Sequence, residues 1–229
     1  MFNFLTVNIC AELFCLIVAI TCLTKDSNLI WKGQIVFILI TCVVEIEGLR
    51  LKKDYVRALN GHLSLPHGNV WLYNILLVLQ AIFISLMFYD VLKKYIKSWP
   101  VITCGLAILT LFYTIDLDQH GVFKKHNNTT LAMSILFVVY GYYYYYLLIK
   151  DVRDYNLSTL SAFWWVTGAL FFFFGQITST VFFQILSTID IKIITTYTIY
   201  KILNVILYGC WSYSFICKKW EMNKPLSWS

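Results

Sequence analysis

Two charged residues lie inside apolar stretches of this chain, where a charge is costly. Lys201 lies within TYTIYKILNVILYG, residues 196–209, and Glu12 lies within NICAELFCLIVAI, residues 8–20. An ionised side chain in hydrocarbon needs a partner or water, and such residues therefore mark functional sites or pair with one another. A carboxylate and an amine in a desolvated pocket also have movable pKa values, which suits proton coupling or pH sensing.

Polar residues of other apolar segments reach the same depth. A helix rises about 1.5 Å per residue, which places Glu12, Gln80 and Asn204 roughly 15 Å from the N-terminal-side membrane edge. Lys201 lies at roughly 12 Å by the same rise, and Gln176 comes close to that level from the opposite direction. The sequence therefore predicts one polar layer built from four helices.

The spacing of the polar residues indicates that each helix turns one polar face inward. Steps of three, four and seven residues place side chains on one side of a helix, and unpaired polar groups avoid lipid. The candidate ligand- or proton-binding residues are Asn8, Glu12, Glu45, Tyr73, Gln80, Gln176, Tyr197, Lys201, Asn204 and Tyr208. Glu45 and Tyr73 lie nearer the membrane edge, as a vestibule. Glu47 is expected to pair locally with Arg50, one turn further along the helix.

Two interpretations of the polar layer remain open. In the first, Lys201 pairs with Glu12 and the amides join helices by hydrogen bonds, so the layer is structural. In the second, the layer contacts a ligand, a substrate or a proton. Two charged groups exceed what holding helices together requires, which favours the second interpretation.

The composition places these segments in a membrane. The chain of 229 residues is 59% hydrophobic and only 13% charged, whereas soluble domains carry about 25% charged residues. The mean hydropathy is +0.70. We therefore expect an all-α, polytopic bundle that forms a single domain over residues 1–229. The predicted membrane spans are about 2–24, 30–50, 69–92, 99–117, 129–149, 161–187 and 193–217.

Lys and Arg counts give a direction for the bundle. Ten of them lie on the side of the C-terminus and seven on the other side, with Lys201 set apart. The positive-inside rule therefore predicts a cytoplasmic C-terminus and an external N-terminus. Trp164 and Trp165 are expected at headgroup level on the C-terminal side. The net charge of +6 is interpreted as loop and juxtamembrane charge and not as a nucleic-acid surface.

The chemistry of other classes of protein is missing from the sequence. The histidines have no metal-ligand spacing, and there is no Walker loop, GxSxG or HExxH motif. We expect no enzyme activity, no metal, no cofactor and no disulfide. An internal repeat is also considered: YNILLVL (73–79) aligns with YKILNVI (200–206), and at the same offset Gly48 falls on Gly175. It would give a layout of three helices, a linker helix and three more in parallel orientation.

The chain resembles the microbial rhodopsins in three features: the number of helices, their orientation and a lysine in the seventh helix. Lys201 would correspond to the retinal-binding lysine of that family. The carboxylate-rich third helix of that family is absent, because helix 3 has no acid before Asp90. Length and a three-one-three layout are similar to the SWEET and PQ-loop transporters, but the Pro-Gln signature is missing. The chain is identified with neither family.

The leading expectation is a small receptor or sensor that binds a ligand or proton and signals through a protein partner. It predicts a cavity closed on the C-terminal side. A secondary transporter that uses Glu12 and Lys201 is the rival, and it predicts a path through Thr178, Thr180 and Tyr208. An intramembrane assembly or effector subunit is the third, and it predicts that Gly168, Gly175 and Gly209 meet another protomer.

Overall fold

The structure is a computed structural model that describes residues 6–60, 68–152, 156–186 and 194–223; the side chains of 56–60 and 182–197 lie outside the description. Within these ranges it contains seven α-helices, one short 3-10 turn and no strand. The elements are α1 Val7–Leu23, α2 Leu29–Asn60, α3 Val70–Leu92, α4 Ser98–His120, α5 Asn127–Lys150, η2 Leu157–Thr159, α6 Ser161–Leu186 and α7 Ile194–Asn223.

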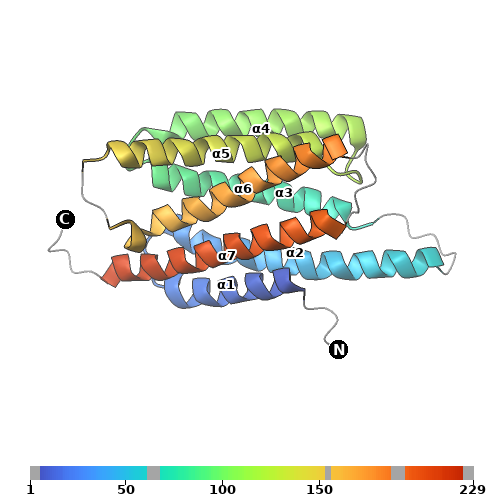
Figure 1. The fold of residues 1–229 in the computed structure, drawn as a ribbon, viewed down its shortest axis with the longest axis horizontal. Coiled ribbons are helices and arrows are strands. Elements are labelled where there is room, and N and C mark those ends of the chain that lie inside the picture. Colours follow the sequence, from blue (N-terminus) through green and yellow to red (C-terminus); the bar gives the residue numbers. More distant parts are fainter. Residues whose placement is uncertain (1–5, 61–67, 153–155, 187–193, 224–229) are drawn as a thin grey trace.

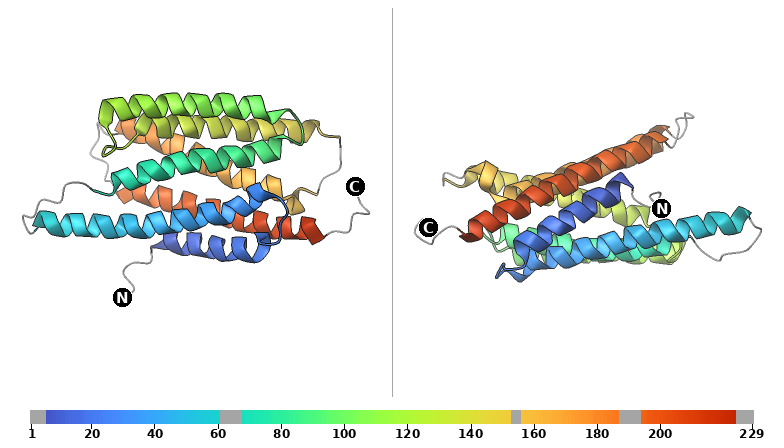
Figure 2. Two further views of the ribbon diagram at one scale, coloured as in Figure 1. Left: turned by 180° about the vertical axis from the view of Figure 1, so that it is seen from behind. Right: turned by 90° about the horizontal axis from the view of Figure 1, so that it is seen from below.

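The helices pack in chain order around one bundle, and α7 closes the ring against α1 (Figure 1). Inside the ring α3 also contacts α5, while α4 packs against α3 and α5 at the periphery. The start of α1 and the end of α7 lie at opposite ends of the bundle (Figure 2). Helices α1, α2, α3, α6 and α7 therefore share one interior space, from which α4 is remote.

The lengths and hydropathy of the helices are those of a membrane protein. Five helical segments, within α2 to α6, are long and apolar enough to cross a bilayer, and α1 is a shorter apolar helix of 17 residues. Helix α7 is long but less apolar, because polar residues and a basic end interrupt it. The prediction of an all-α, polytopic membrane bundle is confirmed.

Helix α2 is longer than the sequence predicts. We expected a loop from Leu51, yet α2 continues through LKKDYVRALN to Asn60 and projects beyond its neighbours (Figure 1). The added segment contains no Gly or Pro, and its Lys, Arg, Ala and Leu residues are good helix formers. The predicted pair of Glu47 and Arg50 forms nearby, with 3.6 Å between Oε2 and Nη1.

Glycines let α6 approach α7 closely. A Cβ atom at Gly168 would lie 2.8 Å from Cβ of Cys210, and one at Gly175 would lie 2.5 Å from Leu203. The two glycines are seven residues apart and so lie on the same helix face. They meet α7 of the same chain, whereas the assembly-subunit hypothesis expected them to meet another protomer.

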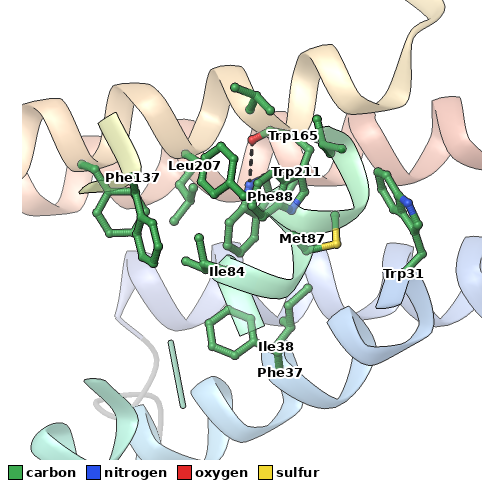
Figure 3. Packing of buried hydrophobic residues seen from close by; sticks show 14 of the residues in the cluster. Trp31, Phe37, Ile38, Ile84, Met87, Phe88, Phe137, Trp165, Leu207 and Trp211 are labelled. Atoms are coloured by element: carbon green, nitrogen blue, oxygen red, sulfur yellow. Dashed lines mark hydrogen bonds between the residues drawn. The ribbon is translucent and has the colours of Figure 1, made fainter. Parts of the chain in front are cut away.

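A layer of aromatic rings crosses the bundle between its two ends (Figure 3). The rings of Trp165 and Trp211 stack with centroids 5.5 Å apart, and Nε1 of Trp211 donates to the Trp165 carbonyl at 3.2 Å. Phe88 meets Trp165 edge-on at 5.3 Å, and Phe37 lies 6.2 Å from Trp211. Trp165 is fully buried in this layer, so the expectation that it sits at headgroup level is wrong.

All seven cysteines are free thiols, and they differ sharply in exposure. Cys15, Cys22, Cys42 and Cys217 are buried, Cys210 is intermediate, and Cys10 and Cys104 are exposed.

Candidate functional site

A polar cavity of about 300 Å³ lies between five helices, on the N-terminal side of the aromatic layer. Each of α1, α2, α3, α6 and α7 contributes side chains to it. The lining residues are Glu12, Phe37, Thr41, Glu45, Tyr73, Leu76, Gln80, Phe172, Gln176, Tyr200, Asn204, Leu207, Tyr208 and Trp211.

Seven of the ten sequence-derived candidates line this cavity: Glu12, Glu45, Tyr73, Gln80, Gln176, Asn204 and Tyr208. They come from segments up to 196 residues apart in the chain, and the ring-shaped packing of the helices brings them together.

Two carboxyl groups face the cavity, one from α1 and one from α2. The side chain of Glu12 is 2% exposed, and its Oε2 has no hydrogen-bond partner among the described residues. It lies beside the hydroxyl of Tyr208 and within electrostatic range of Glu45. Glu45 Oε2 accepts a hydrogen bond from the hydroxyl of Tyr73 at 3.2 Å. The Oε2 atom of Glu12 is therefore a buried hydrogen-bond acceptor with no donor among the described residues. A ligand of the cavity is a candidate donor to it.

Tyr73 reaches Glu45 because Gly48 makes room for its ring. A Cβ atom at Gly48 would lie 2.6 Å from the Tyr73 hydroxyl oxygen and 3.0 and 3.1 Å from two of its ring carbons. The Gly48 carbonyl also accepts a hydrogen bond from the Asn69 side chain at 2.9 Å, which ties the start of α3 to α2. These contacts hold the Tyr73 hydroxyl in the position from which it donates to Glu45.

Three amides also line the cavity. Gln80 comes from α3, Gln176 from α6 and Asn204 from α7, whereas the carboxyls come from α1 and α2. The side-chain oxygen of Gln176 accepts a hydrogen bond from Ser134 of α5 at 3.0 Å, so this amide is held in place. The lining thus combines acidic and amide groups from five helices.

Lys201 does not line the cavity, and no ion pair joins it to Glu12 in the part of the chain that the structure describes. The open interpretation in which Lys201 pairs with Glu12 therefore gains no support, and the reason is register. Depth counting assumed that both helices begin at one plane, but α7 begins farther toward that end than α1 does (Figure 1). Glu12 consequently lies beside Tyr208, seven residues beyond Lys201, or roughly 10 Å along the axis.

The other two candidates have different outcomes. Asn8 lies one turn before Glu12, outside the lining, and its Oδ1 is buried without a hydrogen-bond partner among the described residues. The side chain of Tyr197 lies outside the described residues.

Sequence reasoning missed three aromatic residues of the lining, Phe37, Phe172 and Tyr200, whereas helical spacing had placed Trp211 on the same face as Asn204 and Tyr208. A signal existed on α7, where residues 200, 204, 207, 208 and 211 form a stripe with helical spacing. Lys201 falls at the margin of that stripe. Phe37 and Phe172 lie in ordinary apolar runs, and nothing in their spacing distinguishes them from lipid-facing residues.

The aromatic layer bounds the cavity toward the C-terminal end. On α7 the lining ends at Trp211, and on α2 it ends at Phe37, and both rings belong to that layer. Gln34 lies one turn beyond Phe37 and is fully buried, with no partner for either amide atom among the described residues.

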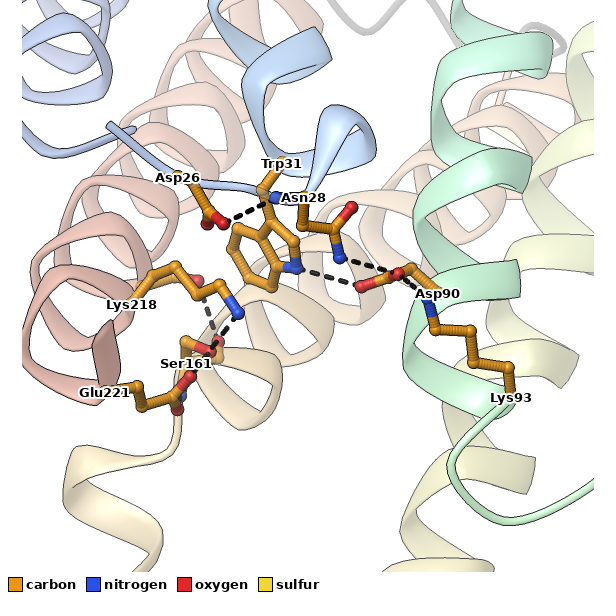
Figure 4. Close-up of polar contacts among 9 residues, drawn as sticks. Asp26, Asn28, Trp31, Asp90, Lys93, Ser161, Lys218 and Glu221 are labelled. Carbon is orange, nitrogen blue, oxygen red and sulfur yellow. Dashed lines mark hydrogen bonds and ion pairs between the residues drawn. The ribbon is translucent and has the colours of Figure 1, made fainter. Parts of the chain in front are cut away.

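A second polar cluster lies at the opposite end of the bundle (Figure 4). Asp90 of α3 accepts hydrogen bonds from Asn28 at 2.8 Å and from the indole of Trp31 at 2.9 Å. Glu221 of α7 accepts from the backbone and the hydroxyl of Ser161, at 2.8 Å each. A cavity of about 230 Å³ lies between these groups.

The described residues hold no group of three or more His, Cys, Asp or Glu side chains placed to bind a metal ion. No family model, curated protein or solved structure matches this chain, so its site is interpreted from its own geometry.

Proposed function

We propose that the protein is an integral membrane receptor or sensor that binds a small ligand or a proton in the cavity and signals through a protein partner. One observation carries this proposal: Glu12 has a buried carboxyl oxygen with no hydrogen-bond partner among the described residues, and Glu12 and Glu45 line the same cavity. Burying a polar group without a partner costs stability, so its retention there favours a functional role.

The aromatic layer supports a sensor over a transporter. It separates the cavity from the C-terminal end of the bundle, as a sensor requires. The path expected for a transporter is not supported at Thr178, which is exposed and donates its hydroxyl hydrogen to the Phe174 carbonyl of its own helix.

Helix α7 provides a route for a signal. Tyr208 and Trp211 line the cavity, and the same helix ends at Asn223, where Glu221 holds the start of α6 through Ser161. A ligand that repositions Tyr208 or Trp211 therefore acts on the helix that meets the second polar cluster. A partner that contacts this end would detect the change, since allosteric coupling needs an element that both sites bias.

Tryptophan fluorescence tests the proposal, because Trp211 borders the cavity. The protein in lipid nanodiscs is titrated from pH 8 to about pH 5, and we expect an emission change that Glu12→Gln abolishes. Glu47→Gln is the matched control, since Glu47 is a half-exposed residue outside the lining, paired with Arg50. An emission change that is identical in the wild type and both variants would contradict a role for the cavity.

A proton-coupled transporter is the second candidate, and Gln34 favours it. This buried amide lies on α2 between Phe37 of the first cavity and Trp31 of the second. Proteoliposomes containing a pH-sensitive dye decide between the two. A sensor gives the same proton leak as empty liposomes, whereas a transporter gives a faster flux that Glu12→Gln and Gln34→Leu both reduce.

A further inference from the structure

We infer that the ligand of the cavity is a small organic cation with a protonated or quaternary ammonium group. The inference rests on the proposed binding function and names the chemical class of its ligand. It follows from the charge, the aromatic lining and the distribution of hydrogen-bonding groups around the cavity.

The lining contains two acidic groups, and a bound cation favours their ionised form. Glu12 and Glu45 both face the cavity, and no Lys or Arg is present among the described lining residues. Two carboxylates that share a poorly solvated space repel each other, and a cation placed between them relieves that repulsion. Tyr73 donates to Glu45 and Tyr208 lies beside Glu12, so the Oε2 atom of Glu12 is the carboxyl oxygen without a donor among the described residues.

The aromatic lining favours an organic cation. Rings of six residues border the cavity: Phe37, Tyr73, Phe172, Tyr200, Tyr208 and Trp211. The faces of aromatic rings attract ammonium groups by cation–π interaction, and cages of such rings recognise quaternary ammonium ligands. Trp211 is the strongest ring of this kind, and it stands on the same helix as Tyr208, which lies beside Glu12.

A divalent metal ion fits this lining poorly. Calcium takes six to eight oxygen ligands, and the described residues hold no group of three or more His, Cys, Asp or Glu side chains placed to bind a metal ion. An aromatic ring supplies no ligand to a hard cation. The volume of about 300 Å³ also matches the lower range of pockets for small organic molecules.

The amides of the cavity specify the rest of the ligand. Gln80, Gln176 and Asn204 line the cavity together with the carboxyls, and Ser134 holds the Gln176 side chain. Such groups hydrogen-bond a hydroxyl, a carbonyl or an amide. We therefore infer a ligand that carries both an ammonium group and a neutral hydrogen-bonding group.

Choline and its uncharged isostere 3,3-dimethyl-1-butanol test the inference, because they share shape and hydroxyl group and differ in charge. Binding to the protein in nanodiscs is measured by calorimetry and by tryptophan emission, with ethanolamine and calcium chloride as further probes. We expect choline or ethanolamine to bind at least tenfold more tightly than the butanol, and calcium to give no saturable signal.

Variants make the assignment specific. We expect Glu12→Gln and Phe172→Leu each to weaken ammonium binding at least tenfold, and Glu47→Gln to leave it unchanged. Circular dichroism and gel filtration establish that each variant is folded. Phe172→Leu keeps the charge of the cavity, so it tests the aromatic contribution independently of Glu12.

The outcomes separate the ligand class from the proposed function. Equal binding of choline and the butanol, or binding of neither ammonium probe, would overturn the organic-cation inference. In either case a pH-dependent emission change that requires Glu12 would still support the proposed function. Saturable calcium binding that is lost in Glu12→Gln would likewise overturn the inference and replace it with a metal site.

Discussion

At the scale of single residues, two carboxyl groups and three amides line the cavity, and Lys201 lies outside the lining. Glu12, Gln80 and Gln176 were found from polarity and helical spacing alone, because a polar side chain amid apolar ones must avoid lipid. Lys201 obeys the same rule but lies at the margin of the α7 stripe. Spacing gives the face of a residue, whereas its neighbours depend on where each helix begins.

Gly48 gives the sharpest prediction at this scale. Gly48→Ala places a Cβ atom 2.6 Å from the Tyr73 hydroxyl, so the ring must move away from Glu45. We expect destabilisation of about 1–3 kcal/mol from overpacking, together with a weaker fluorescence response of the cavity. Thermal unfolding in detergent micelles, followed by circular dichroism, measures the stability.

Gly33→Ala on the same helix is the matched control. A Cβ atom at Gly33 would lie 3.5 Å from Phe83, an ordinary contact, so this variant should unfold at the wild-type temperature or slightly above. Equal stability of the two variants would refute the steric role of Gly48.

At the scale of helices, boundaries set by composition were predictable and those set by packing were not. The ends of α3 and α6 fall within a residue or so of the predicted spans, because apolar runs stop sharply there. Helix α2 continues past its span, since helix propensity persists in water after hydropathy falls. The close approach of α6 to α7 depends on two glycines that were considered as an interface with another protomer.

The contact between α6 and α7 is testable through Gly168. In Gly168→Ala a Cβ atom would lie 2.8 Å from Cβ of Cys210 and 3.2 Å from the Leu207 carbonyl oxygen. Neither the backbone nor a Cβ atom can rotate away, so the helices must separate, at a cost of about 1–3 kcal/mol. Helices that move apart also deform the cavity, because Leu207 and Phe172 line it.

Gly209→Ala provides the comparison, because nothing lies within 4 Å of a Cβ atom at that position. This variant should equal or exceed the wild type in stability, since alanine favours a helix by up to about 1 kcal/mol over glycine. Unfolding by sodium dodecyl sulfate titration ranks the three proteins. Loss of stability at Gly209 that matched the loss at Gly168 would contradict the packing explanation.

At the scale of the whole molecule, the bundle has two polar ends separated by aromatic rings. The cavity holds acids and amides at one end, and Asp90 and Glu221 organise the other. The all-helical membrane fold followed from hydropathy, because spanning segments must satisfy their backbone internally. The order in which the helices pack around the bundle did not follow from hydropathy. Apolar helices fit many partners in lipid, and their close contacts depend on side-chain shape.

The orientation of the bundle is a prediction at this scale. The surplus of Lys and Arg beside the C-terminus predicts that this end lies in the cytoplasm. In a cysteine-free background, Lys52→Cys should react with a membrane-impermeant maleimide in intact cells, and Lys219→Cys should react only after lysis. The reverse labelling pattern would show the opposite topology, with the cavity on the cytoplasmic side.

The unequal burial of the thiols has a consequence for watching this protein move. Cys15 and Cys42 lie in the core cluster, while Cys10 and Cys104 are exposed on the outer surface of the bundle. A core thiol becomes reactive only when its surroundings open, because amides and thiols inside a packed bundle are reached through local unfolding. The rate at which each native thiol is modified therefore reports motion of the bundle. The exposed thiols give a reference rate, and the rate at the buried thiols reports how often the interior opens.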